Sequence, residues 1–455
     1  MGRPVTVDDN EMGMEKALAR LRQSFREKSS VDMSFSCGAR MGDASLRAFV
    51  DALRVTLLEI RSVSFDSSAI DENSASPETV ELFLRELGSI PSLAKLSWQR
   101  TRPQTRQQCI QRMTMVLSRA RRLERLHCYS CSAFQGTVQD YHNFASVLES
   151  HPKLHAIQFL PAIFPRGLQP GTANLLPAEE IISVKISPVL EAIATIPNLA
   201  VFHGDCWLPP PPPPHLVEEA EDDEEDEDED DMDDVDDTFQ PAIQAMKSIS
   251  GHSRLQQITI YGPSLVAAAP ELHTNATLRF LKVKLGMIKR RTRSNNTFEG
   301  QVLADVVRSA PSLATLVLTV GHEALRCRID GQILHVIQAL QENTTITKLD
   351  LPYHPKNHDI QEAMIDMLQE NNMTLTEINV LLSSDNDNAA EDETFLQKQE
   401  FFLRLNRLGR KRLLQLSPAD RRPWIETLAT VSNDVSSLFY FLSKNPTLCS
   451  HVATE

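Results

Sequence analysis

The sequence predicts an α/β solenoid in which a curved parallel sheet lies inside and a layer of helices lies outside. Between residues 30 and 383, an apolar helical stripe, a polar turn and a short strand recur about ten times. Most successive strands begin 29 to 35 residues apart, which is about the length that one strand, one helix and two turns need. A unit of this size cannot bury its apolar face alone, so neighbouring units are expected to stack.

The most regular copy shows how each unit is expected to fold. Residues 333–340 carry apolar side chains at positions i, i+3, i+4 and i+7 of a helix, and residues 343–345 form a polar turn. In the strand that follows, Ile346, Leu349 and Leu351 face inward. The seventh copy has a poor helical stripe. The ten strands are predicted to begin at residues 60, 93, 123, 154, 199, 255, 278, 313, 346 and 375.

The inward spacing Leu-x-x-Leu-x-Leu resembles the leucine-rich repeat, in the long, helix-containing subtype typified by ribonuclease inhibitor. The resemblance covers residues 30–383 and implies a concave strand face suited to binding a protein. Residues 1–29 are expected to form a polar tail and a capping helix, because apolar residues recur there at helical spacing. Residues 394–455 are expected to form a helical cap at the other end.

The C-terminal cap is expected to contain three helices, of which the first is broken at Gly409 and the second runs through Trp424. Asp434 caps the third helix, whose expected inward residues are Val435, Leu438, Phe439 and Leu442. The cap is similar to the tail of a large family of diatom leucine-rich-repeat proteins in the segments Phe402–Arg410, Trp424, Leu438–Leu442 and Asn445–Cys449. That resemblance implies the architecture and no assigned activity.

The acidity of the chain is local. Residues 218–237 hold seventeen Asp and Glu residues, so removing these charges from the net charge of -15 leaves +2 for the rest. Such a segment repels itself and is expected to be disordered. It would engage basic proteins such as histones, or would only keep the chain in solution. The six prolines of residues 209–214 are expected to form a polyproline II helix, either as a ligand for an SH3, WW or profilin module or as a stiff spacer.

Insertions follow several strands, and all of them leave from the same rim of the predicted solenoid: residues 161–180, 208–238, 284–297 and 382–393. Insertions on one face often mark the binding face of a repeat array. One insertion is basic, with Lys289, Arg290, Arg291 and Arg293 following Lys282 and Lys284. We expect that the acidic segment is able to mask this basic rim. The runs 289–291 and 410–412 also match weak nuclear-localisation patterns.

No motif for catalysis, a metal or a cofactor is evident, so we expect no enzyme activity and no cofactor. Cys128 and Cys131 form a lone CxxC at repeat positions and are expected to be structural. His127 and His203 are expected on strands that are separated by one intervening strand, and this distance is too long for the two to share a metal ion easily. Seven scattered cysteines, no signal peptide and no apolar run of membrane-spanning length favour a reducing compartment, cytoplasmic or nuclear.

We expect the protein to be a non-enzymatic scaffold for protein–protein interaction. We expect it to bind neither a membrane nor nucleic acid directly. The alternatives are a regulator of a small GTPase, resembling Ran GTPase-activating protein, or a substrate adaptor for ubiquitin ligation. The candidate partner-binding residues lie at outward strand positions or in the basic rim: His127, Tyr129, Gln158, His203, Asp205, Tyr261, Lys282, Lys284, Lys289, Arg290, Arg291 and Asp350.

Overall fold

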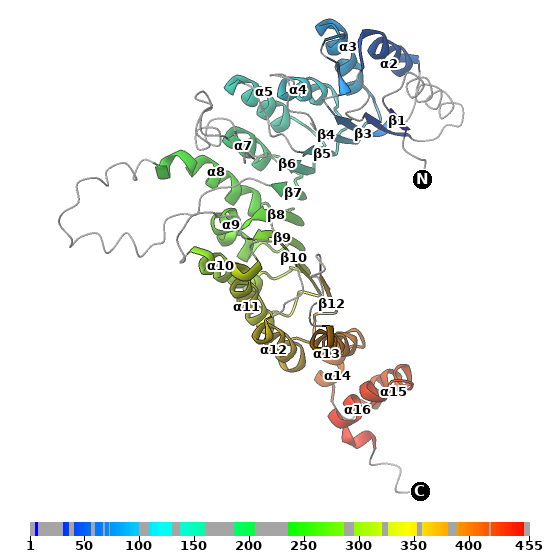
Figure 1. Ribbon diagram of the computed structural model, residues 1–455, viewed down its shortest axis with the longest axis vertical. Helices are drawn as coiled ribbons and strands as arrows, with labels where there is room; N and C mark the ends of the chain where they lie inside the picture. Colours follow the sequence, from blue (N-terminus) through cyan, green and yellow to red (C-terminus); the bar gives the residue numbers. More distant parts are fainter. Residues whose placement is uncertain are drawn as a thin grey trace, which may run out of the picture. The chain divides into compact units, whose positions relative to one another are not determined.

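The computed structural model divides into two compact units, residues 1–278 and residues 279–455, shown in Figure 1. The structure describes residues 5–7, 31–35, 41–55, 60–66, 69–71, 73–99, 109–129, 137–159, 186–204, 235–285, 295–320, 326–352, 357–380, 389–417 and 420–449. The predicted capping helix of residues 1–29 and most of the predicted insertions lie outside these ranges.

The first unit is an open parallel sheet whose strands alternate with helices that lie on one face of the strands (Figure 1). Its strands pair in chain order, and each helix packs against the next. Its elements are β1 (Val5–Val7), β2 (Val31–Phe35), α2 (Asp43–Val55), β3 (Ile60–Asp66), α3 (Pro77–Gly88), β4 (Lys95–Gln99), α4 (Cys109–Arg119), β5 (Arg125–Tyr129), α5 (Val138–Glu149), β6 (Ala156–Phe159), α7 (Ser187–Ala194), β7 (Val201–Gly204), α8 (Val235–Ser250), β8 (Gln257–Tyr261) and α9 (Gly262–Thr274).

The second unit continues the same alternation and ends in helices. Its strands β9 to β12 also pair in parallel and in chain order. Its elements are β9 (Phe280–Leu285), α10 (Asn295–Ser309), β10 (Thr315–Val320), α11 (Arg326–Glu342), β11 (Lys348–Leu351), α12 (His358–Asp366), the π-helix η5 (Met367–Asn371), β12 (Glu377–Val380), α13 (Ala389–Arg407), α14 (Arg410–Gln415), α15 (Arg421–Thr430), α16 (Val435–Lys444) and the 3₁₀ turn η6 (Pro446–Leu448).

Both units therefore show the arrangement of an α/β solenoid of the leucine-rich-repeat kind. The predicted inward residues are the core: Ile346 and Leu349 are 0% exposed, and Leu351 is 1% exposed. The strands begin within about two residues of the predicted positions, because the first leucine of each copy lies in the turn that enters the strand. Alternate strand residues point to opposite faces, which leaves every second side chain on the face opposite the helices. We call this the open face.

An aromatic cluster fills the core near the start of the first unit. The Phe35 ring lies edge-on to three other rings, those of Phe49, Phe65 and Phe83, with ring centroids 5.3 to 5.7 Å apart. Trp98 continues the cluster, with its ring 4.8 Å from that of Phe65. These rings come from two helices and three strands, so they join three successive repeats, and aromatic rings favour the edge-to-face geometry seen here.

Buried asparagine side chains connect successive repeats where each helix ends. In the second unit, Asn372 Nδ2 donates to the Leu340 carbonyl (2.6 Å) of the preceding repeat. Its Oδ1 accepts the backbone N–H groups of Thr374 (3.0 Å) and Leu375 (2.8 Å) in its own turn. Asn343 bridges to the Val307 carbonyl in the same way, at 2.6 Å. One side chain thus satisfies the end of one helix and the turn into the next strand.

The bridge recurs in both units, with a histidine in place of asparagine at some positions. Asn275 Nδ2 donates to the Ser250 carbonyl (2.8 Å), and His151 Nε2 lies 2.9 Å from the Ala120 carbonyl. Asn406, in α13, donates to the Leu375 carbonyl at 2.8 Å. Asn275, Asn343 and Asn372 are the asparagines of Asn-x-Thr sequences, and all three are less than 10% exposed, so their role in the fold is internal.

The C-terminal cap is attached to the last repeat by a buried arginine. Gly409 adopts φ +84°, which ends α13 and confirms the predicted break. Arg410 is 0% exposed, donates through Nη2 to the carbonyls of Leu368 and Asn372, and lies 5.7 Å from the Phe402 ring centroid. Burial lowers the pKa of Arg410, but an arginine keeps its charge at neutral pH.

Four sequence-based expectations need correction. β1 pairs with β2, so the sheet begins in the part of the chain predicted as a polar tail. α9 is a full helix of 13 residues. Its buried stripe consists of Leu265, Ala268, Ala269 and Leu272, and a search for large apolar residues overlooks the two alanines. α8 begins at Val235, so the last residues of the segment predicted to be disordered are helical. In α16, Val435 is 78% and Phe439 is 73% exposed, while Ser437 and Phe441 are buried.

We predict that Asn372→Ala lowers the free energy of unfolding by about 3 kcal/mol, because it leaves a buried carbonyl and two buried N–H groups without partners. The matched control is Asn371→Ala, since Asn371 is the preceding residue and is exposed; its effect is expected to stay within about 0.5 kcal/mol. Urea unfolding followed by circular dichroism measures both variants. Equal destabilisation by the two substitutions would contradict the bridging role of Asn372.

Candidate functional site

A polar row crosses the open face of the first unit. Backbone pairing places His127, Gln158, His203 and Thr259 at the same level of four neighbouring strands. On the other side of His127 the row continues through serines, in the order Ser97, Ser64 and Ser34. The three predicted site residues of β5 to β7 are therefore neighbours. All three side chains are half-buried.

His127 is held in its neutral form. Burial is the largest cause, and the nearby charges of Lys95, His203 and Arg125 act in the same direction, so the pKa of His127 falls from its usual 6.5 to about 4. His203 Nδ1 lies 2.5 Å from Thr259 Oγ1 on the next strand. At neutral pH His127 therefore offers an uncharged ring that donates and accepts hydrogen bonds.

Two cations lie beside this row that sequence reasoning did not select. Lys95 and Arg125 are paired in register on β4 and β5, and their side chains are half-buried and exposed, respectively. Like charges directly opposite each other destabilise a sheet, so this position attracts an anion. The signal was present in the sequence: both residues alternate with the inward residues of their strands, as the selected outward residues do.

The second unit has its own open-face residues. Lys282, on β9, is in register with Val317 of β10, which is in register with Asp350 of β11. Asp350 Oδ1 accepts a hydrogen bond from Asn379 Nδ2 at 3.0 Å and lies 3.8 Å from Lys348 Nζ. The Asp350 carboxylate is thus already engaged by side chains of this chain. The pattern of one strand could not predict this, because Asn379 lies on the neighbouring strand.

Lys348 and Glu377 form the strongest contact of that network. The two residues are in register on β11 and β12, and Lys348 Nζ lies 2.8 Å from Glu377 Oε1. This hydrogen bond raises the pKa of Lys348 and lowers the pKa of Glu377. Lys348 alternates with inward Leu349, and its ammonium group is occupied by a residue 29 positions away, in the next repeat.

The remaining predicted site residues differ in outcome. Tyr261 is only 7% exposed and offers little side-chain surface, because β8 leads directly into α9 at this residue. Lys284 is half-buried on β9. The side chain of Tyr129, Asp205 and residues 289–291 lie outside the described part of the structure.

No group of three or more His, Cys, Asp or Glu residues that could hold a metal ion occurs among the described residues. Cys128 is buried, with its Sγ 3.4 Å from Met113 Sδ, as expected for a packing residue; Cys131 lies outside the described ranges. No described helix is long and apolar enough to cross a membrane. Burial of Arg410 also removes the first residue of the weak nuclear-localisation pattern at 410–412 from the surface.

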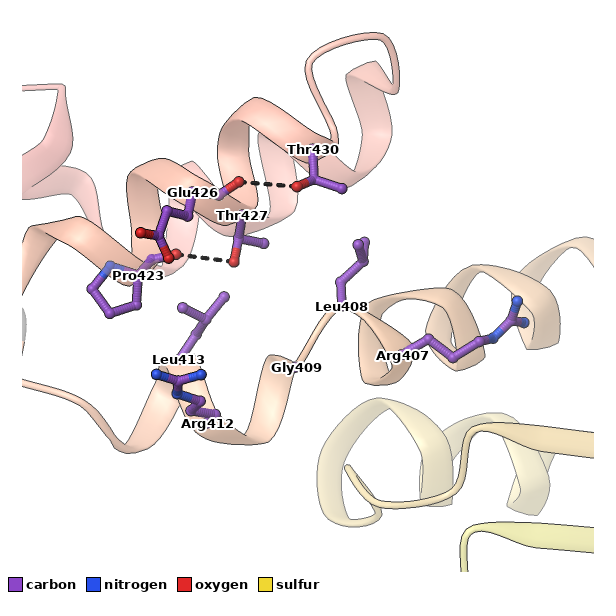
Figure 2. Close-up of a pocket in the computed structure, with 9 residues that line it drawn as sticks. All are labelled: Arg407, Leu408, Gly409, Arg412, Leu413, Pro423, Glu426, Thr427 and Thr430. Atoms are coloured by element: carbon purple, nitrogen blue, oxygen red, sulfur yellow. Dashed lines mark hydrogen bonds between the residues drawn. The ribbon is translucent and has the colours of Figure 1, made fainter.

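A groove of about 250 Å³ lies in the cap, between the end of α13, α14 and α15 (Figure 2). The Thr427 and Thr430 hydroxyls donate to helix carbonyls, at 3.0 Å each, so their protons are already used. Arg407 at the rim is paired with Glu400 at 2.5 Å. The lining contains neither His nor Cys, so it lacks a nucleophile or base of those types: Arg407, Leu408, Gly409, Arg412, Leu413, Pro423, Glu426, Thr427 and Thr430.

Comparisons with known proteins add little to this geometry. No family model matches the chain, and no curated protein matches it. Among solved structures, one that matches is that of leiomodin-1 actin-binding site 2, with 16% sequence identity and a TM-score of 0.27; the match covers 39% of this chain and 98% of that chain. At this TM-score the likeness carries no argument about a partner of this chain.

We predict that His127 remains neutral until the pH falls to about 4. Because its pKa is lower in the folded than in the unfolded chain, the unfolded state binds more protons between about pH 6.5 and 4. Stability is therefore lost as the pH falls through that window, and His127→Gln is expected to reduce the loss. Urea midpoints at several pH values compare the two proteins. A titration of the His127 ring by NMR near pH 6.5 would contradict the prediction.

Proposed function

We propose that this protein is a non-enzymatic scaffold that binds a partner protein through its open face and rim segments. The observation that carries the proposal is the polar row of β5 to β7, where His127, Gln158 and His203 present half-buried hydrogen-bonding groups side by side. Side chains of this kind add specificity to a contact without the desolvation cost of buried charges. We also propose that the repeats are of the long ribonuclease-inhibitor-like subtype, on the basis of their length.

The adjacent cations indicate what chemistry the partner offers. Lys95 and Arg125 lie on neighbouring strands, and parallel strands are ~4.8 Å apart, so one carboxylate group could lie near both cations. A partner segment with Asp or Glu residues next to neutral polar groups fits this surface. Such a contact gains specificity and speed of association from electrostatics, and it weakens as salt is raised.

Two sequence segments that lie almost wholly outside the described residues extend the proposal. The acidic segment 218–237 has the charge to engage basic proteins, and the prolines of residues 209–214 have the composition of a ligand for a proline-reading domain. The prolines precede α8, and the acidic segment runs into its first residues, so both join the fold through the helix of one repeat. They are proposed as a second contact that acts independently of the open face.

We predict that the double substitution Lys95→Glu, Arg125→Glu weakens binding of an open-face partner about tenfold. Arg119→Glu is the control, because Arg119 is an exposed cation at the end of α4 on the helix side. The immobilised full chain and both variants capture proteins from extract at low salt, and the captured sets are quantified by mass spectrometry. If no captured protein is reduced by the double substitution alone, the open face is not the binding surface.

A second prediction concerns the acidic segment. Deleting residues 209–234 keeps α8, which begins at Val235, and is expected to abolish capture of basic proteins such as histones at low salt. Capture of open-face partners is expected to stay the same, since the deletion leaves Lys95, Arg125 and the polar row in place. A matched version with the Asp and Glu residues replaced by Asn and Gln separates charge from length. Histone capture that survives this replacement would contradict an electrostatic role.

A further inference from the structure

Four side chains form a rectangle on the open face of β4 and β5. Lys95 is in register with Arg125, and Ser97 is in register with His127. Each of them alternates with an inward residue of its strand, so all four point to the open face. The two strands are ~4.8 Å apart, and residues i and i+2 of a strand are about 7 Å apart. One small group is therefore able to reach all four side chains, which we call the donor rectangle.

The donor rectangle concentrates positive charge. All four side chains are able to donate hydrogen bonds, and two of them are cations. Burial and the charges of Lys95, His203 and Arg125 lower the pKa of His127 to about 4, which shows that both cations act on the ring. On the adjacent strands β3 and β6, the described residues at these two levels are serine, alanine and glutamine, so none of them is acidic.

The two cations of the donor rectangle differ from other cations of the protein in their partners. Arg54, for example, pairs with Glu86 of the next repeat at 2.7 Å. Lys95 and Arg125 form no ion pair with an acidic side chain among the described residues. Two like charges side by side destabilise a sheet, and an anion that binds to both offsets this cost.

We propose that the donor rectangle binds a phosphate group on a phosphorylated serine or threonine of the partner protein, which rests on the proposed role of the open face as the binding surface. A phosphate monoester carries ~1.5 to 2 negative charges at pH 7 and presents three acceptor oxygens, so it matches two cations and two neutral donors. A carboxylate carries one charge on two oxygens and uses fewer of these donors. Clusters of basic side chains are a general means of recognising phosphorylated peptides.

The charge of the donor rectangle is confined, which favours one phosphate over a chain of them. At the level of the two cations, the next residues are Ser62 on one side and Ala156 and Val201 on the other. A nucleic acid gains its affinity from cations at successive phosphates, and these neighbouring positions carry none. A phosphorylated side chain needs a single site, so a phosphopeptide fits this surface better than a nucleic acid does.

The neighbours of Arg125 indicate what lies next to the phosphorylated residue. Ala156 is 6% exposed and Val201 is half-buried, so they form an apolar strip at the same level of β6 and β7. Val201 lies two strands, or about 10 Å, from Arg125, a distance that an extended peptide covers in about three residues. We therefore expect an apolar side chain two or three residues from the phosphorylated one, with Gln158 and His203 beside it.

A phosphoserine peptide library tests the proposal. The immobilised full chain is incubated with short peptides that carry a central phosphoserine and degenerate flanks, and with matched libraries in which serine or glutamate replaces it. The native protein is expected to retain about tenfold more of the phosphoserine library than of the glutamate library. The retained peptides, identified by mass spectrometry, are expected to be enriched in apolar residues two or three positions from the phosphate.

Variants connect this preference to the donor rectangle. The double substitution Lys95→Gln, Arg125→Gln is expected to remove the preference for phosphoserine over glutamate, because it removes both cations. Arg119→Gln is the control, since Arg119 is an exposed cation at the end of α4 on the helix side, and it is expected to retain the libraries as the native protein does. Circular dichroism melting shows that each variant keeps its fold.

The outcomes separate this proposal from the proposed function. Equal retention of the phosphoserine and glutamate libraries, or no retention of either, overturns the phosphate site. A preference that survives the double substitution overturns its location. A single-stranded oligonucleotide that binds more tightly than the selected phosphopeptides assigns the site to nucleic acid instead. Phosphatase treatment of the extract is expected to remove the captured open-face partners; partners that are still captured uphold the proposed function and overturn this inference.

Discussion

The fold depends on a side-chain bridge that closes the ends of several helices against the next repeat. A helix ends with carbonyl groups that lack partners within the helix, and in a stacked array those groups are covered by the neighbouring repeat. Asn343 and Asn372 supply the missing donor and hold their own turn with the same amide. The bridge thereby sets both the spacing of the repeats and the position at which the next strand begins.

Because the bridges and the apolar core lie on the helix side, the side chains of the open face contribute little to holding successive repeats together. Its residues are then able to vary, and they do: the row changes from serines in β2 to β4 to His127, Gln158 and His203 in β5 to β7. Where the face carries charge, its arrangement differs between the units. Lys348 and Glu377 satisfy each other, whereas Lys95 and Arg125 lie side by side with the same sign.

The periodic part of the fold could be predicted from the sequence, because a strand with Leu-x-x-Leu-x-Leu spacing leaves only one way to bury Leu349 and Leu351. The outward positions of His127, Gln158 and His203 followed from the same alternation of inward and outward residues along each strand. The Lys348–Glu377 pair could not be predicted, since it depends on the register of two strands. The inward face of α16 was predicted wrongly because both of its sides are apolar, and periodicity alone does not rank Phe439 against Phe441. What decides between them is the contact of Phe441 with Trp424.

The cap follows from the same constraint as the repeats. Asn406 and Arg410 donate hydrogen bonds to backbone carbonyls of the last repeat. Arg410 does so from α14, after the break at Gly409, and its longer side chain takes the role that asparagine has in the repeats. A buried guanidinium needs such acceptors, because desolvating its charge without them is costly. α13 and α14 therefore end the array by satisfying its last carbonyl groups. α16 is followed by Asn445, which is buried and accepts a hydrogen bond from the Thr447 hydroxyl, so the turn after this helix resembles the turns of the repeats.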